Sequence, residues 1–117
     1  MKFADYIKTQ EAEGKEKHVP AIDVKECSSC NELIVTVQVG KEVMHPSTVE
    51  HHIKYIQLFG EKNDNKFVHI STMELGEENT LPRGKVNIKK DGFKNLIALS
   101  FCNIHGIWEN NLEVKNG

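Results

Sequence analysis

The stretch LIVTVQV at residues 33–39 carries the clearest structural signal in the chain. Its odd-numbered positions are all aliphatic, and its even-numbered positions include Thr36 and Gln38. Successive side chains of a β-strand point to opposite faces, so a period of two is the period of a strand. The stretch therefore predicts a strand with one buried face.

Similar runs lie on both sides of this stretch. IKYIQLF at residues 53–59 predicts a second strand, and the other candidate strands are 18–24, 67–75, 85–89, 96–101 and 107–114. Turn signals separate the runs at Gly40, His45-Pro46, 60–65, 76–84 and Asp91-Gly92. About seven short strands with polar connections predict an all-β fold, an antiparallel β-sandwich of the immunoglobulin-like type.

The N-terminal region has a different pattern. Residues 4–13 carry a weak apolar stripe that Gly14 interrupts, which predicts a short helical segment. The chain has 117 residues, a length that favours one compact domain over residues 1–117.

Charge and hydropathy restrict the partners of the chain. The net charge is -2, from 15 basic and 17 acidic residues, which argues against a strongly basic nucleic-acid face. We find no apolar run long enough for a bilayer and no secretion signal in the charged N-terminus. We therefore expect a cytoplasmic protein with neither a nucleic acid nor a membrane as partner.

Three segments concentrate histidine and cysteine, the side chains that bind transition metals most often. They are EKHVP at 16–20, HPSTVEHHI at 45–53 and CNIHG at 102–106. Each lies at a predicted strand end or loop, where distant parts of a chain can converge. Taken singly, each histidine is more often a surface or turn residue than a ligand, and a lone cysteine is more often a small buried hydrophobe.

The third segment is the most informative by itself. A buried-looking strand ends directly in Cys102, and a turn returns His105 three residues later, with Gly106 permitting unusual backbone angles. A cysteine and a histidine at this spacing can bind one metal ion. Backbone N–H groups of such a turn can point at the sulfur and tune the metal.

Together and in this order, the three segments resemble the superoxide reductases of the desulfoferrodoxin family. The resemblance extends from DYIKT at 5–9 to IALSFCNIHGIWE at 97–109. It implies an immunoglobulin-like sandwich with one iron per chain, as in the single-iron, neelaredoxin-like form. It further implies that His18, His45, His51 and His105 are the equatorial nitrogen ligands and that Cys102 is the axial thiolate.

The resemblance also implies an activity and partners. The reaction reduces superoxide to hydrogen peroxide with one electron and two protons, without releasing oxygen. Lys17 would attract the superoxide anion, and Glu16 would offer an oxygen ligand to ferric iron. The electron donor would be rubredoxin or a similar small redox protein, and the chain would form a homo-oligomer, such as a tetramer.

Other interpretations of the sequence stay open. The chain could be a non-catalytic binding module with an incidental metal, a superoxide dismutase or a facial-triad iron oxygenase, although the triad needs a carboxylate where this set offers a thiolate. The pair Cys27 and Cys30 matches no ligand position of the family. It is either a reduced or oxidised pair on a loop, or part of a metal site shared by two chains.

Overall fold

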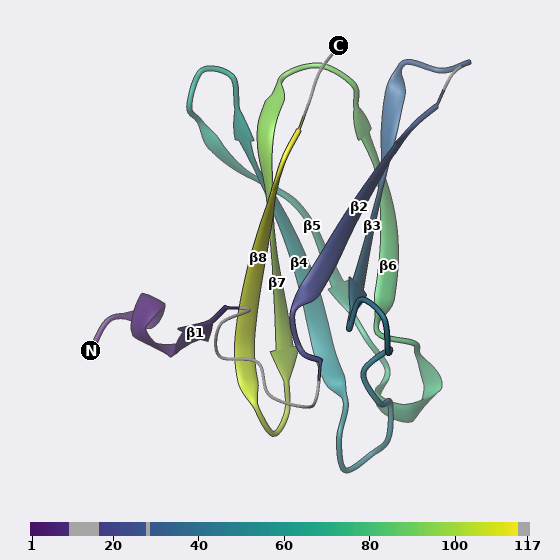
Figure 1. Cartoon of the computed structure of the whole chain (residues 1–117), viewed down its shortest axis with the longest axis vertical. Coiled ribbons are helices and arrows are strands. Elements are labelled where there is room, and N and C mark those ends of the chain that lie inside the picture. The colour runs from purple at the N-terminus through teal and green to yellow at the C-terminus, as the bar shows by residue number, and fades with distance from the viewer. Residues whose placement is uncertain (10–16, 28, 115–117) are drawn as a thin grey trace.

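Two β-sheets build the molecule in the computed structural model, which describes residues 1–9, 17–27 and 29–114 (Figure 1). The larger sheet has the strand order β1-β8-β7-β4-β5, and the smaller has β2-β3-β6. The strands are β1 (Ile7–Lys8), β2 (Pro20–Glu26), β3 (Glu32–Val39), β4 (Ile53–Lys62), β5 (Phe67–Glu74), β6 (Arg83–Lys89), β7 (Phe93–Cys102) and β8 (Gly106–Glu113). The predicted all-β sandwich is confirmed.

The core lies between the two sheets and follows the alternation read from the sequence. In β3 the side chains of Val35, Val37 and Val39 are fully buried, whereas the even-numbered positions are only partly buried. Ile56 and Leu58 of β4 and Leu96 and Ala98 of β7 belong to the same buried cluster. Their burial against β3 joins the two sheets.

The N-terminal region corrects one prediction. The predicted short helical segment is present as a 3-10 helix over Phe3–Tyr6, but Ile7–Lys8 form β1 where the helix was expected to continue. β1 pairs in parallel with β8, with Ile7 opposite Ile107 and Lys8 opposite Trp108. Pairing with a strand about a hundred positions away overrides the weak helical stripe; residues 10–16 lie outside the described ranges.

The turn expected at residues 60–65 is also displaced, because β4 continues to Lys62. Gly60 lies inside the strand, where an added Cβ would be 2.5 Å from an atom of the Phe93 ring. The glycine thus makes room for a core aromatic ring. It does not end the strand.

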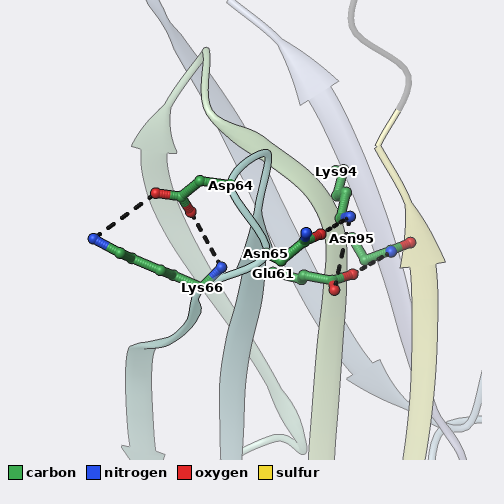
Figure 2. A network of polar contacts seen from close by, with 6 residues as sticks. All are labelled: Glu61, Asp64, Asn65, Lys66, Lys94 and Asn95. Atoms are coloured by element: carbon green, nitrogen blue, oxygen red, sulfur yellow. Dashed lines mark hydrogen bonds and ion pairs between the residues drawn. The ribbon is translucent and has the colours of Figure 1, made fainter.

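The sandwich has two ends of different character. We call the end with the β7–β8 connection the metal end, and the end with the β2–β3 and β4–β5 connections the hairpin end (Figure 1). At the hairpin end, side chains of the β4–β5 hairpin and of β7 form the polar contacts drawn in Figure 2. In the described part of the chain, no helix has the length and apolar character that crossing a membrane requires.

Candidate metal centre

The predicted metal ligands converge at the metal end from three separate connections of the fold. His18 precedes β2, His45 and His51 lie between β3 and β4, and Cys102 and His105 flank the turn between β7 and β8. One ligand atom from each of His18, His51, Cys102 and His105 lies within 4.8 Å of every other. His45 is not in that group, but its Nε2 is 3.6 Å from Cys102 Sγ.

The four imidazole rings follow one another around a closed circuit. Ring centroids are 5.1 Å apart for His18 and His45, 4.4 Å for His45 and His51, 5.2 Å for His51 and His105, and 4.6 Å for His105 and His18. Across the circuit, the His18 and His51 centroids are 6.3 Å apart. The sulfur of Cys102 is 3.6 Å from His45 and 3.8 Å from His105 Nδ1. The arrangement is a circle of four imidazole rings with one sulfur close to two of them.

The donor set fits a metal ion in both chemistry and spacing. His18 Nε2 and His105 Nδ1 are 3.0 Å apart. Two nitrogens this close can both reach one ion, because metal–nitrogen bonds are about 2.1 Å long. His18 and His45 are only 4% and 3% exposed, and Cys102 is fully buried, so the donors lie in a protected site.

The tautomer of His45 also suits a ligand. Its Nδ1 lies 2.8 Å from the carbonyl oxygen of Pro46. A carbonyl oxygen can only accept, so Nδ1 carries the proton and donates, and the lone pair of the ring is on Nε2. Metal-binding histidines are commonly oriented by such a bond from the other ring nitrogen. The nitrogen directed at Cys102 is therefore the one that can bind a metal.

The turn after β7 fixes the geometry around the sulfur. The backbone N–H of His105 donates to Cys102 Sγ at 3.4 Å, as the sequence predicted for this turn. Gly106 has a φ of +84°, although a Cβ there would meet no atom within 4 Å. The requirement for glycine is thus conformational, since a left-handed backbone closes the turn and returns the chain into β8.

His51 and His52 lie in different surroundings, and the predicted cause, strand alternation, is not the reason. Both residues precede β4, so strand alternation does not apply to them. Thr48 closes a turn instead: its N–H donates to the carbonyl oxygen of His51, and its Oγ1 accepts from the His51 N–H. His51 joins the candidate centre, whereas the buried His52 ring donates from Nδ1 to the carbonyl oxygens of Thr48 and Val49.

Asn103 connects the two ligand-bearing loops. Its Oδ1 accepts from the His52 N–H at 2.8 Å, its own N–H donates to the His52 carbonyl at 3.1 Å, and its Nδ2 donates to the Glu50 carbonyl at 2.9 Å. His51 lies between the two bonded residues, and Asn103 follows Cys102 directly. One side chain therefore sets the position of His51 relative to the sulfur.

Trp108 and Lys8 support the other half of the ring. The Trp108 indole stacks on His18, with centroids 4.7 Å apart and planes inclined by 11°. Its Nε1 and the Lys8 Nζ both donate to the carbonyl oxygen of His105, at 3.2 and 3.0 Å. The backbone carbonyl of His18 accepts from the buried Ser100 hydroxyl at 3.1 Å. Asn103, Trp108 and Lys8 were not predicted from the sequence, although the first two lie in or beside the CNIHG segment.

Of the two charged residues in the first motif, Lys17 lies within the described residues and Glu16 does not. Lys17 is exposed, directly before the buried His18, so its ammonium group is free to reach solvent beside the centre. Glu16 lies outside the described residues. His69, which no motif included, is exposed on β5 and bonds Thr72.

A β-sandwich with a ring of histidines and one cysteine at its end belongs to the class of metal-binding all-β proteins. Residues 10–111 match the family model described as Desulfoferrodoxin. The chain therefore belongs to the desulfoferrodoxin family.

Relatives over the full length agree with this assignment. The chain is 37% identical to the superoxide reductase of Pyrococcus abyssi, over 95% of this chain and 97% of that protein. It is 34% identical to the neelaredoxin of Megalodesulfovibrio gigas, over 97% and 98% of the two chains. A crystal structure of a superoxide reductase in the oxidised state superposes with a TM-score of 0.86 at 33% identity, over 97% of this chain and all of that one.

Proposed function

We propose that this chain is a superoxide reductase that reduces superoxide to hydrogen peroxide at one mononuclear non-haem iron, held by a single domain over residues 1–117. The observation that carries the proposal is the convergence of His18, His51, Cys102 and His105 within 4.8 Å. Two full-length relatives named superoxide reductase and neelaredoxin support it.

Five side chains would hold the metal. They are the imidazoles of His18, His45, His51 and His105, which would offer nitrogen, and Cys102, which would offer a thiolate. Five protein donors would leave room at the metal for a small substrate. When bound, iron supplies the one-electron redox chemistry that the reaction needs and that zinc lacks.

Cys102 would tune the site from its buried position. A thiolate donates electron density to a metal, and a hydrogen bond to the sulfur reduces that donation. The His105 N–H at 3.4 Å from Sγ is such a bond. The chain thereby sets the reduction potential through its own turn, together with the burial of the sulfur.

Lys17 and Glu16 would act on the substrate side. An exposed ammonium group next to His18 attracts a small anion over distances of about 10 Å at moderate ionic strength. Lys17 can also hold a water that delivers a proton. Glu16 adjoins Lys17 in the chain, and its carboxylate would provide an oxygen ligand after product release.

Partners and location follow from the same proposal. Electrons would come from rubredoxin or a similar small redox protein. A groove beside His105, lined by Phe3, Tyr6, Ile104 and others, offers such a donor an apolar surface close to a ligand. We further propose a cytoplasmic homo-oligomer, such as a tetramer, with one iron in each chain.

The decisive experiment combines metal analysis with product stoichiometry. Protein loaded with ferrous iron should bind one equivalent, absorb visible light when oxidised and bleach on reduction. With excess reductant it should yield one hydrogen peroxide for each superoxide consumed, with no oxygen released. Release of oxygen with half that peroxide yield would identify a dismutase, and a colourless, inactive protein would identify a binding module.

A further inference from the structure

A second cysteine site lies at the hairpin end, away from the candidate metal centre (Figure 1). Cys27 and Cys30 form a disulfide in the connection between β2 and β3, with Cα atoms 5.4 Å apart. Cys30 is exposed and Cys27 half-buried, whereas Cys102 is fully buried. Among the cysteines, this pair alone is open to reagents in solution.

Contacts other than the disulfide also hold the hairpin. The Cys27 N–H donates to the Glu32 carbonyl at 3.2 Å, and Glu26 is paired with Leu33 in the ladder below it. Directly after β6, the Lys90 ammonium contacts the Glu26 carboxylate. A disulfide that closes so short a loop removes little chain entropy from the unfolded state, so its stabilising effect is small. The same hairpin can therefore hold both the disulfide and the dithiol.

We propose that Cys27 and Cys30 form a redox-active pair that consumes hydrogen peroxide, the product of the proposed superoxide reductase. In the dithiol form, the thiolate of the more exposed Cys30 attacks a peroxide oxygen and breaks the O–O bond, giving a sulfenic acid. The displaced hydroxide takes up the proton that Cys30 lost and leaves as water. The second thiol then attacks that sulfur and expels a second water. Two electrons from the thiols reduce one peroxide, and the disulfide is the oxidised product.

The return step is thiol–disulfide exchange with an external dithiol, either a small molecule or a redox protein that carries two cysteines. Its thiolate attacks the exposed Cys30 sulfur, and its second thiol resolves the mixed disulfide. Two electrons and two protons pass to the pair. Exposed disulfides are the kind that undergo such exchange, and a reducing cytoplasm, where we place the chain, would supply the dithiol.

Electron counting separates the two sites. The iron centre transfers single electrons, whereas a dithiol and a peroxide each exchange two, so the pair suits the product and not the superoxide substrate. The burial of Cys102 keeps its sulfur out of these exchanges. One chain would thus remove superoxide at one end and peroxide at the other.

Counting thiols tests the proposal in the folded, iron-loaded chain. Dithiothreitol is added under native conditions and removed, and hydrogen peroxide is then added equimolar with the protein. After denaturation, alkylation and mass measurement, the reduced chain should carry three modified cysteines and the peroxide-treated chain one. A disulfide that resists dithiothreitol until the protein unfolds would overturn the proposal, as would a reduced pair that peroxide leaves unchanged.

Variants separate this pair from the iron chemistry. Because peroxide is added directly, the Cys102→Ser chain should lose its two remaining thiols as the wild type does, whether or not the reductase assignment holds. The Cys27→Ser chain should instead stop at a sulfenic acid on Cys30, which dimedone would label. The double variant Cys27→Ser, Cys30→Ser should keep the iron content and superoxide reductase activity of the wild type. Closure that requires intact Cys102 would overturn the independence of the two sites.

Discussion

The two ends of the sandwich are built from different kinds of contact. At the metal end, segments separated by up to 97 residues meet. Hydrogen bonds between backbone groups and the side chains of Asn103, Ser100 and Trp108 hold them in place. At the hairpin end, the side chains of Figure 2 pair within a hairpin or with the neighbouring strand, as Lys66 does with Asp64 and Asn95 with Glu61. This difference indicates that the two sheets alone do not fix the geometry of buried side chains. That geometry is fixed where hydrogen bonds join loops that are distant in the sequence.

The largest effect is expected at the sulfur of the metal end. Cys102→Ser should abolish the visible charge-transfer band and reduce superoxide reductase activity to background, because serine cannot provide the thiolate. Spectroscopy of the oxidised protein and a superoxide assay measure both. The double variant at Cys27 and Cys30 is the control, and a normal spectrum in Cys102→Ser would remove this residue from the site.

Replacing histidines should also affect iron binding differently at the two ends. Alanine at His18, His45, His51 or His105 should lower iron affinity by about 100-fold or more, since each removes a nitrogen donor and ligand losses exceed the usual effect of supporting residues. His69→Ala should keep full iron content, because His69 is exposed on β5. Iron content after dialysis against a chelator provides the measurement.

His52→Ala is expected to fall between these limits. It removes a ring that is 6% exposed and bonds two loop carbonyls, so unfolding free energy should fall by about 1–3 kcal/mol while iron still binds. A complete loss of iron in a folded His52→Ala chain would mean that the roles assigned to His51 and His52 are reversed.

Asn103 and Asn95 provide a matched test of the two ends. Asn95 lies in β7 near the hairpin end, and Asn103 directly follows β7 at the metal end. Asn103→Ala should weaken iron binding by roughly 10–100-fold, because the loop that carries His51 loses its bonds to the Cys102 turn. Asn95→Ala removes a bond to Glu61 at the hairpin end and should leave iron binding unchanged. Equal iron affinity in the two variants would contradict a positioning role for Asn103.

The smallest effect is expected from surface charge. Lys17→Ala should slow the reaction with superoxide by roughly tenfold at low salt and flatten its dependence on ionic strength, with iron content unchanged. Lys66→Ala at the hairpin end is the matched control and should alter neither the rate nor the salt slope. Pulse radiolysis at several salt concentrations measures both variants. If the dependence of the rate on ionic strength were unaltered in Lys17→Ala, Lys17 would be only a solvated surface charge.

Much of the fold could be predicted, because apolar alternation is a local property. The run 33–39 corresponds to β3, and 53–59 lies within β4, which extends further because Gly60 accommodates the Phe93 ring. β1 could not be predicted in this way. Its two residues are extended because they pair with β8, and that partner is not visible in their own sequence.

The candidate site divides in the same way. Its donors could be proposed because histidine and cysteine in three motifs resemble a known family. The residues that orient them could not, since Asn103 and Trp108 act through contacts with loops that only the folded chain brings together. The separation of His51 from His52 depends likewise on the turn that Thr48 closes.

The pairing of β1 with β8 has a consequence for how the protein is made. His18 and His105 are 87 residues apart, and ribosomes extend chains by about 5–20 residues per second, so His18 waits about 4–17 s for its partner. During translation the nascent chain exposes histidines that copper or zinc could occupy. The complete set of five donors forms only when the last strand has emerged and closed against the first. The full set of donors can therefore bind its metal only after synthesis of the chain is complete. Which metal binds then depends on the ions available at that time.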